Sequence, residues 1–328
     1  MKVFENISLR SYNTFGIDVS ARRLIELDHA DSIPHFAEKP LVVGAGSNIV
    51  FTRDYDGTIV TLSDSAEVEL LPGSVVRVWG GMRLDALIGW CVERGLYGLE
   101  NLSAIPGTVG AAVVQNAGAY GVETKDRLLR VEAVNLGDAS VRSFSAQECA
   151  FGYRDSLFKH TDDQWLITHV CFRLADTFTP VMNYKNLETL PHATAAELRQ
   201  AVSDLRWRKL PRPEEHGSAG SFFKNPVVDE ATYRRLKADY PSMPDAYPTQ
   251  EGTPSGAVCY KLSAGWLIDH CGWKGKTLGR AGVWPHQALV LYNTGGCTGH
   301  EVVTLAQTIQ QDVKHKLGVD LVPEAMIV

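Results

Sequence analysis

Apolar and polar positions alternate along much of the first half of the chain, which is the pattern of half-buried strands. "KPLVVGAGSNIVF" has two apolar runs around a glycine-rich turn, and "AEVELLPGSVVRVWGG" predicts a hairpin that turns at Pro72 and Gly73. "RVEAVNLGDASVRSF" predicts two more strands around Gly137 and Asp138, and "QWLITHVCFRL" predicts another. We therefore expect a first half that is rich in sheet.

Other stretches show the spacing of helices. One predicted helix stops at Gly95, and its apolar positions are Leu84, Leu87, Ile88 and Cys91. A second begins at Thr194, which forms a capping box with Glu197. Its apolar positions are Leu198, Ala201, Val202 and Leu205.

The last third of the chain has helices of its own. We expect a domain boundary in "KLPRPEEHGSAG", where prolines and glycines interrupt the pattern. "DEATYRRLKADYP" and "SAGWLIDHCGWK" predict two helices, and a last helix begins at Thr298 with Glu301 as its capping partner and ends at Gly318. The tail "VDLVPEAMIV" predicts a strand that returns to an earlier domain.

The composition is that of a soluble globular protein. The chain has 328 residues, of which 45% are hydrophobic and 21% charged, and its net charge is −6. This length predicts two or three domains. The mild acidity argues against a nucleic-acid partner, because such partners need clustered Lys and Arg.

Leader, membrane and metal functions are not expected. The first residues, "MKVFENISLRSYNTFGID", lack the apolar core of a secretory signal, and no apolar run approaches the ~20 residues of a spanning helix. Six cysteines lie far apart without C-x-x-C spacing, which argues against zinc. Scattered cysteines of this kind indicate reduced thiols in a cytoplasm.

Two glycine-rich stretches are candidate ligand cradles. "GAGSN", residues 44–48, lacks the third glycine and the helix of a dinucleotide-binding turn, so it is either structural or a nest of backbone N–H groups for a phosphate. "IPGTVGAAVVQNAGAYG", residues 105–121, carries no charge. It is either a tightly packed loop or a surface that lets the backbone approach a flat ring or a pyrophosphate, with Gln115 and Asn116 at the ring edge.

Several polar residues stand in unusual surroundings. Ser221, between a glycine and two phenylalanines, either begins a strand or donates a proton. Arg154 in "FGYRDSLFK" is either a surface ion pair or a ligand contact, and Glu324 in "VPEAMIV" is either in water at a strand end or buried for a reason. Taken singly, three others are typical of a solvated face: Tyr184, Arg206 and Lys209.

The order of the motifs carries a resemblance. "NTFGID", "GAGSN", "GLENLSAIPGTVG", "QNAGAYGVE", "FGYRDSLFK", "GSAGSFFKNP", "SAGWLID" and "HQALVL" together resemble the UDP-N-acetylenolpyruvoylglucosamine reductase family. Its members are flavoenzymes that make UDP-N-acetylmuramate for peptidoglycan, and the resemblance covers nearly the whole chain. "QNAGAYGVE" and the tyrosine of "MNYKNL" resemble the longer subtype, which closes a tyrosine-bearing loop over its substrate.

The resemblance implies an α+β architecture. It implies an FAD-binding fold of the vanillyl-alcohol-oxidase type with two subdomains, at 1–64 and at 65–210 with 313–328, and a third α+β domain for substrate at 211–312. NADPH would reduce bound FAD, which would then pass hydride to the enolpyruvyl β-carbon of UDP-N-acetylglucosamine enolpyruvate. We expect a cytoplasmic monomer without nucleic-acid or membrane partners.

By position, the resemblance assigns catalytic roles to Ser221, Arg154 and Glu324. Substrate contacts would come from Tyr184, Lys209, Asn225, Tyr247, Lys274 and Gln287. FAD contacts would come from Asn13, Gly44, Gly46, Ser47, Asn48, Ile105, Pro106, Gly107, Gly110, Gln115, Asn116, Gly118, Tyr120, Gly121 and Ile167. The chain departs from many relatives, which carry serines and a proline, at Ala111, Ala112 and Val113.

These residue types suit the chemistry that the resemblance implies. Arg154 would stabilise charge that develops on the enolpyruvyl carboxylate, and Ser221 would deliver a proton to the α-carbon while the phenylalanines beside it exclude water. Glu324 would hold a proton-bearing group or water, and Lys209 and Lys274 would meet the diphosphate. The alternative is a flavin oxidase or a flavin-binding protein with another substrate. A proton donor at the flavin argues against this alternative, because a binding protein has no use for one.

Overall fold

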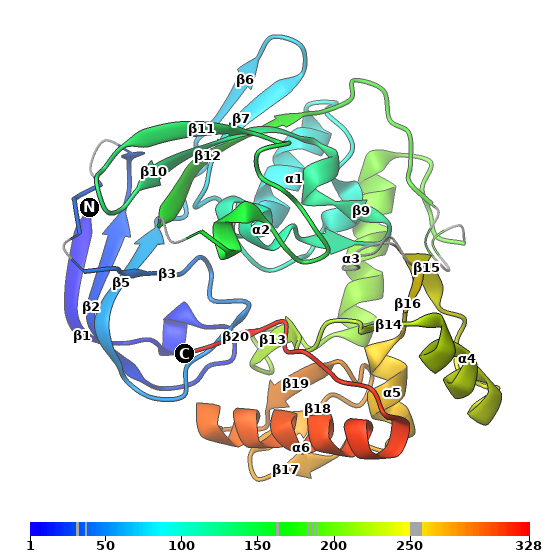
Figure 1. Cartoon of the computed structure of the whole chain (residues 1–328). Coiled ribbons are helices and arrows are strands. Elements are labelled where there is room, and N and C mark those ends of the chain that lie inside the picture. Colours follow the sequence, from blue (N-terminus) through cyan, green and yellow to red (C-terminus); the bar gives the residue numbers. More distant parts are fainter. Residues whose placement is uncertain are drawn as a thin grey trace. The chain divides into compact units, whose positions relative to one another are not determined.

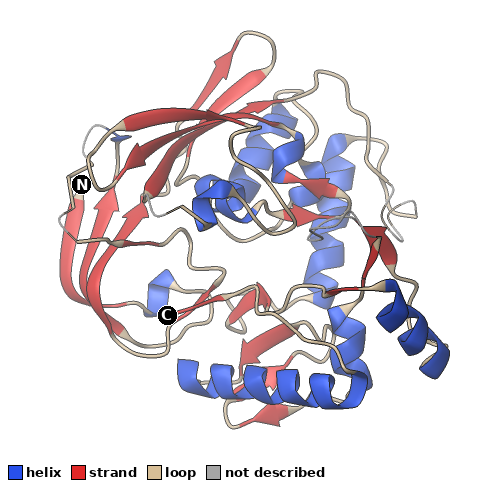
Figure 2. Cartoon of the chain, in the orientation of Figure 1, coloured by secondary structure: helices blue, strands red, loops and turns tan. Residues whose placement is uncertain are grey.

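The structure, a computed structural model, describes residues 1–30, 33–36, 38–161, 164–182, 184, 187, 189–249 and 258–328. The chain forms two compact units, each containing helices and strands (Figures 1 and 2). Unit 1 comprises residues 1–7, 21–46 and 55–207, and unit 2 comprises residues 8–20, 47–54 and 208–328. The change of unit after residue 207 falls near the boundary expected in "KLPRPEEHGSAG". The three-domain division stays a prediction.

Unit 1 begins with a sheet of order β1-β2-β5-β3, whose strands are β1 (Lys2–Ser8), β2 (Ser20–Leu27), β5 (Tyr55–Leu62) and β3 (Leu41–Val42). Both β2 and β3 run parallel to β5, and Leu24 and Leu41 each lie opposite Ile59. Parallel strands are usually covered on both faces. In keeping with that, Leu24, Ile59 and Val60 are at most 1% exposed.

The second sheet of unit 1 is antiparallel and has the order β11-β10-β12-β7-β6. Its strands are β6 (Val68–Leu71), β7 (Val75–Trp79), β10 (Leu128–Asn135), β11 (Val141–Ser145) and β12 (Trp165–Arg173). The two predicted hairpins and the single predicted strand are therefore confirmed. The central strand β12 is buried from Leu166 to Phe172, and this stretch includes the polar Thr168 and His169 among apolar residues.

Helices α1 (Leu84–Glu93) and α2 (Val109–Gln115) pack together, and α2 lies against β7 and β12 (Figure 1). The four predicted apolar positions of α1 are all buried, and Gly95, with φ of +70°, follows its end. α3 (Ala195–Lys209) begins with the predicted capping box, in which the Glu197 backbone N–H donates to Thr194 Oγ1 at 3.1 Å. Short elements complete the unit: β8 (Gly118–Ala119), β9 (Val122–Glu123), and 3-10 turns at Glu100–Leu102, Thr124–Asp126 and Leu157–Lys159.

Unit 2 contains an antiparallel sheet of order β13-β19-β18-β17 and a smaller one of order β14-β16-β15. The strands are β13 (Ser218–Ser221), β14 (Val227–Val228), β15 (Tyr247–Thr249), β16 (Cys259–Lys261), β17 (Thr277–Leu278), β18 (Ala281–Val283) and β19 (Val290–Asn293). The helices are α4 (Glu230–Asp239), α5 (Ala264–His270) and α6 (Gly299–Leu317), as predicted, with a 3-10 turn at Arg10–Tyr12.

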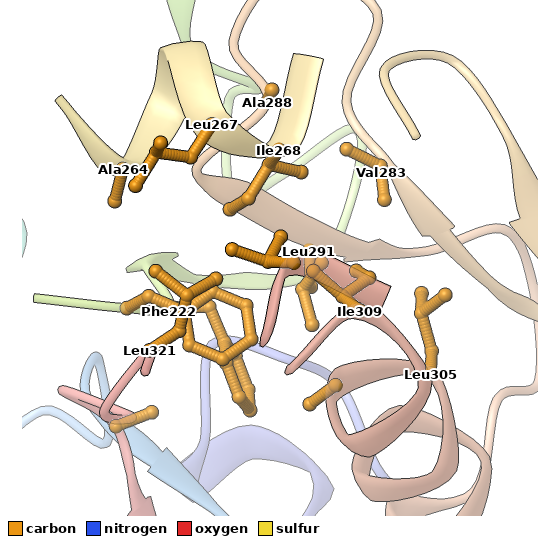
Figure 3. Packing of buried hydrophobic residues seen from close by; sticks show 14 of the residues in the cluster. Phe222, Ala264, Leu267, Ile268, Val283, Ala288, Leu291, Leu305, Ile309 and Leu321 are labelled. Atoms are coloured by element: carbon orange, nitrogen blue, oxygen red, sulfur yellow. The ribbon is translucent and has the colours of Figure 1, made fainter. Parts of the chain in front are cut away.

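The core of unit 2 lies between α5, α6 and the first sheet. In Figure 3, Ile309 from α6, Leu291 from β19 and Ile268 from α5 point toward one another, with Phe222 beside them. The capping box of Thr298 and Glu301 begins α6, and Gly318, with φ of +73°, ends it. Local signals in the sequence therefore place the longest helix correctly.

The C-terminal tail is less regular than predicted. Only β20 (Met326–Ile327) is a strand, and it pairs in parallel with β4 (Ile49–Val50). The tail thus returns to a much earlier segment, which lies in the same unit, and its return to an earlier domain stays a prediction. Upstream, Pro323 forms an isolated bridge with Phe223. Proline has no N–H to donate, which limits how far regular pairing can extend.

Candidate active site

The "GAGSN" turn packs closely against the second glycine-rich stretch. A Cβ atom on Gly44 would lie 2.9 Å from Thr108 Oγ1 and 3.0 Å from the Cβ of Ala111, so no larger residue fits without movement. Thr108 is also the cap of α2, where its hydroxyl accepts from the Ala111 backbone N–H at 3.4 Å. Packing is thus one reason for Gly44. A phosphate contact at this turn stays a prediction.

Residues 105–121 leave an uncharged, partly exposed surface. Ile105, Pro106 and Ala111 are half-buried, whereas Ala112 and Val113 are at most 5% exposed and belong to the core of unit 1. Ala112 and Val113 therefore contribute to core packing. Sharp left-handed backbone turns with positive φ flank the helix at Ala104, Gly107, Asn116, Tyr120 and Gly121. A small, uncharged surface with tight turns fits a planar ring system such as a flavin.

The two amides beside this surface have different surroundings. The Asn116 side chain is fully buried, and its Nδ2 donates to Glu123 Oε2 at 3.1 Å and to the Gly152 carbonyl at 2.9 Å. This amide ends α2 and fixes the next turn. Gln115 is half-buried, and its Oε1 accepts from Lys159 Nζ at 2.7 Å. Direct contact of either amide with a cofactor stays a prediction.

Arg154 lies against the glycine-rich stretch. Its Nη2 donates to the Gly118 carbonyl at 2.7 Å, and its Nη1 is 3.9 Å from Glu123 Oε1. The adjacent Asp155 contacts His160 at 2.7 Å. Lys159, missed by sequence reasoning, donates to the Arg154 carbonyl at 2.9 Å. It follows five residues later in the same motif, which could have indicated it.

Tyr184 is 47% exposed and lies edge-on to Tyr120, with ring centroids 5.5 Å apart. On α3, Arg206 donates through its Nε to the Ala104 carbonyl at 3.3 Å. Burial raises the pKa of the Tyr120 hydroxyl and lowers the pKa of the Arg206 guanidinium. Arg206 was not among the predicted site residues, because its contacts come from distant parts of the sequence.

Ser221 lies at the end of β13 in unit 2, where its side chain is exposed. It stands opposite Val290, after a register shift that includes Gly220 with φ of +67°. The next two residues, Phe222 and Phe223, are at most 1% exposed and lie in the core of unit 2. These rings anchor the backbone that carries the serine, and their part in excluding water stays a prediction.

Glu324 is held beside this strand by backbone contacts. Its N–H donates to the Phe222 carbonyl at 2.7 Å, and its carbonyl accepts from Asn48 Nδ2 at 3.2 Å. The side chain is half-buried. Unit 2 therefore brings together Ser221, Glu324 and Asn48, the last from the "GAGSN" turn, while Arg154 belongs to unit 1.

Other predicted residues make contacts within their own units. Asn13 is 4% exposed, and its Nδ2 donates to the carbonyls of Leu9 and Ile17, so this amide shapes its own loop. Asn225 Oδ1 accepts from the Ala264 backbone N–H at 3.0 Å, at the start of α5. These two side chains therefore have structural roles, whatever else they bind.

The remaining predicted residues belong to several elements of the two units. Lys274 contacts Asp269 at 3.0 Å, and Gln287 Oε1 accepts from the Leu289 N–H at 3.4 Å. Tyr247 is 71% exposed in β15. The others are placed as follows: Lys209 is exposed at the end of α3, Gly46 and Ser47 adjoin β4, Gly110 opens α2, and Ile167 is buried in β12.

Two features are absent from the part of the chain that the structure describes. No helix there is long and apolar enough to cross a membrane. No group of three or more His, Cys, Asp or Glu side chains there is arranged to hold a metal ion.

Comparison with known proteins gives a consistent family. Residues 212–328 match the C-terminal domain of UDP-N-acetylenolpyruvoylglucosamine reductase, and residues 35–145 match an FAD binding domain. The chain is 43% identical to the UDP-N-acetylenolpyruvoylglucosamine reductase of Pseudomonas aeruginosa, over 99% of this chain and 98% of that protein. It is 41% identical to that of Bacteroides fragilis, over 98% of each.

A solved structure agrees. The reductase from Thermus caldophilus superimposes with a TM-score of 0.71 at 26% identity, covering 100% of this chain and 99% of that one. The predicted α+β fold with an FAD-binding region is confirmed by this likeness and by the domain match. The chain belongs to the UDP-N-acetylenolpyruvoylglucosamine reductase family.

Proposed function

We propose that the protein reduces UDP-N-acetylglucosamine enolpyruvate to UDP-N-acetylmuramate, with FAD bound and with NADPH as the source of electrons, in peptidoglycan precursor synthesis. The observation that carries this proposal is the match along nearly the whole chain to reductases of this family. The uncharged surface of residues 105–121 offers FAD a place beside Arg154, in keeping with the FAD binding domain match. FAD when bound would supply hydride transfer from NADPH to the enolpyruvyl β-carbon.

Arg154 is the residue proposed to stabilise the negative charge that develops on the substrate. An enol ether is electron-rich and resists hydride, so its carboxylate must take up negative charge as the β-carbon is reduced. A guanidinium presents its N–H donors in a planar fork that matches a carboxylate. The bond to the Gly118 carbonyl orients that fork, which is the preorganisation that electrostatic catalysis requires.

Ser221 and Glu324 are the proposed proton-handling residues. After hydride transfer the α-carbon needs a proton on a defined face, and Ser221 is the proposed donor. A serine hydroxyl is a weak acid, but the group that it would protonate is strongly basic. Glu324, on the segment paired with the strand of Ser221, would hold a proton-bearing group or water.

The nucleotide part of the ligands needs cations and hydrogen-bond donors. We propose that Lys209 and Lys274 meet the diphosphate and that Tyr184, Asn225, Tyr247 and Gln287 bind the remainder. Because NADPH and the UDP-sugar both carry a diphosphate and both react at one flavin, we propose that they bind in turn at one place. We further propose that the enzyme is a cytoplasmic monomer, which its six free cysteines suit.

Product analysis tests the proposed function. Purified protein with FAD, NADPH and UDP-N-acetylglucosamine enolpyruvate, without oxygen, should yield UDP-N-acetylmuramate by mass spectrometry. A protein that oxidises NADPH only with oxygen, and leaves the enolpyruvyl sugar unchanged, would instead be a flavin oxidase.

A further inference from the structure

Arg154 occupies the third position of a tight turn in unit 1. The Asp155 backbone N–H donates to the Gly152 carbonyl at 3.3 Å, and the Gly152 N–H donates back to the Asp155 carbonyl at 3.1 Å. Between them, Arg154 has a φ of +54°, a left-handed conformation that favours glycine at this position of a turn. A residue with a side chain is strained there, and such strain persists only where the surrounding structure imposes it.

Ser156 anchors the exit of this turn to the end of α2. Its side chain is 1% exposed, and its Oγ donates to the Val114 carbonyl at 2.7 Å. Val114 lies in the last turn of α2, where backbone carbonyls need partners from outside the helix. The buried hydroxyl therefore satisfies a helix end and fixes the turn on it with the same bond.

Two other side chains hold the turn. At its start, the fully buried Asn116 donates through Nδ2 to the Gly152 carbonyl at 2.9 Å. In its middle, Lys159 Nζ donates to the Arg154 carbonyl at 2.9 Å. With Ser156, these contacts hold the backbone before, at and after Arg154, which is the kind of support that a strained conformation requires.

The Arg154 guanidinium is directed by the same part of unit 1. Its Nη2 donates to the Gly118 carbonyl at 2.7 Å, and its Cζ lies 5.2 Å from the centre of the Tyr153 ring, within the range of a cation–π contact. Gly118 is only four residues after Val114, the partner of Ser156. A shift of the turn relative to the end of α2 would therefore change the direction of the guanidinium.

We propose that Ser156 is a positioning residue for Arg154. Its hydroxyl fixes the strained turn on the end of α2, so that the guanidinium points to the place where negative charge develops on the substrate. A donor that is aimed in advance needs no reorganisation at the moment of reaction. The inference rests on the proposed function for that reaction, whereas the hold of Ser156 on the turn can be measured without a substrate.

Hydrogen exchange on the flavin-loaded enzyme measures this hold. In Ser156→Ala, the backbone amides of residues 152–155 should exchange about 2- to 10-fold faster, as expected for the loss of one hydrogen bond that supports the turn. Ser203→Ala is the matched control, because Ser203 Oγ also donates to a backbone carbonyl, that of Arg199 at 2.8 Å, but within α3. Exchange in the turn should stay at the wild-type rate in this control. Unchanged exchange in Ser156→Ala would overturn the proposal.

Stopped-flow measurement of the two half-reactions separates positioning from general support of the fold. Ser156→Ala should slow oxidation of the reduced flavin by UDP-N-acetylglucosamine enolpyruvate by roughly 10- to 100-fold, the scale of loss when a catalytic group is slightly misplaced. Reduction by NADPH should stay near the wild-type rate, because Arg154 is proposed to act on the enolpyruvyl carboxylate. Equal slowing of both half-reactions would mean that Ser156 supports the flavin site as a whole, and would overturn the proposal.

A double-variant comparison shows whether Ser156 acts through Arg154. Ser156→Ala should have little further effect on the substrate-dependent rate in Arg154→Met, because the positioned group is already absent. Equal fold-losses in the wild-type and Arg154→Met backgrounds would mean that Ser156 acts independently of Arg154, which contradicts positioning.

The exchange and rate measurements distinguish this proposal from the proposed function. If the reduced wild-type flavin is not oxidised by the enolpyruvyl sugar, the proposed function fails. Faster exchange at residues 152–155 in Ser156→Ala would still support the hold of Ser156 on the turn of Arg154.

Discussion

The backbone N–H of Glu324 donates to the Phe222 carbonyl at 2.7 Å, which places the proposed catalytic glutamate across from the residue that follows Ser221. A second bond, from the Lys224 N–H to the Val322 carbonyl at 2.9 Å, continues this pairing. Phe222 is fully buried in the core of unit 2, so its side chain anchors this backbone pairing (Figure 3). The two proposed proton-handling residues are therefore held by one rigid piece of backbone.

This arrangement predicts a specific defect for Glu324→Gln. Gln cannot exchange a proton, so oxidation of the reduced enzyme by the enolpyruvyl substrate should slow by roughly 10²- to 10⁴-fold, the usual range for general acid–base catalysis. Reduction by NADPH should stay near the wild-type rate. Both rates are measured by stopped-flow absorbance of the flavin, and an unchanged substrate-dependent rate would remove Glu324 from the proton path.

Tyr184→Phe tests the exposed hydroxyl next to Tyr120. The variant keeps the ring contact and loses only the donor, so we expect substrate affinity to fall by roughly 10- to 150-fold, as for a hydrogen bond to a charged group. The maximal rate of reduction by NADPH should change much less. Flavin-fluorescence titration gives the affinity, and wild-type affinity in the variant would exclude Tyr184 from the ligand site.

Lys209→Ala tests whether the two polyanionic ligands use the same cation. We expect weaker binding of both NADPH and the UDP-sugar, because each diphosphate loses the same partner. In wild-type steady-state kinetics, double-reciprocal lines should be parallel, with high UDP-sugar inhibiting competitively against NADPH. Intersecting lines without such inhibition would show two separate sites.

The part-buried pair of Arg77 and Glu132 predicts a pH-dependent stability. Arg77 Nη2 donates to Glu132 Oε2 at 2.7 Å, and this contact lowers the pKa of Glu132 below its ordinary value. Because the folded-state pKa is the lower one, the stabilisation is present above the unfolded pKa and is lost as pH falls through the folded pKa.

We therefore expect Arg77→Met to lower the free energy of unfolding at neutral pH by about 1–3 kcal/mol. The difference from wild type should shrink as pH falls below the unfolded-state pKa of Glu132, about 4, and vanish only below the lower folded-state pKa. Urea unfolding at several pH values measures it. A difference that is constant with pH would mean that Arg77 acts through packing alone.

Local signals made the helices predictable. Thr194 and Thr298 each stand three residues before a glutamate, and both capping boxes form as expected. The tail was predicted less well, because the bridge at Pro323 and the pairing of Met326 with Ile49 depend on residues far away in the sequence. No local pattern marks such pairs.

The site divides in the same way. The motifs indicated Arg154 and Ser221. The structure adds that Arg154 is held by a hydrogen bond to the Gly118 carbonyl, and that the backbone of Ser221 is anchored by the buried phenylalanines that follow it. Arg206 was not recognised, since its hydrogen-bond partner Ala104 is about a hundred residues earlier in the chain. A single arginine on a helix resembles any solvated residue until these contacts are known.

The most direct test of the account is the anaerobic stopped-flow comparison of wild type and Ser221→Ala. The wild-type flavin should lose its yellow colour with NADPH and regain it with UDP-N-acetylglucosamine enolpyruvate. In Ser221→Ala the first change should keep nearly its wild-type rate, whereas the second should slow by roughly 10²- to 10⁴-fold, because the proton donor is missing. Equal slowing of both changes would mean that Ser221 only shapes the site, and a wild-type flavin that stays bleached with the enolpyruvyl sugar would contradict the proposed reaction.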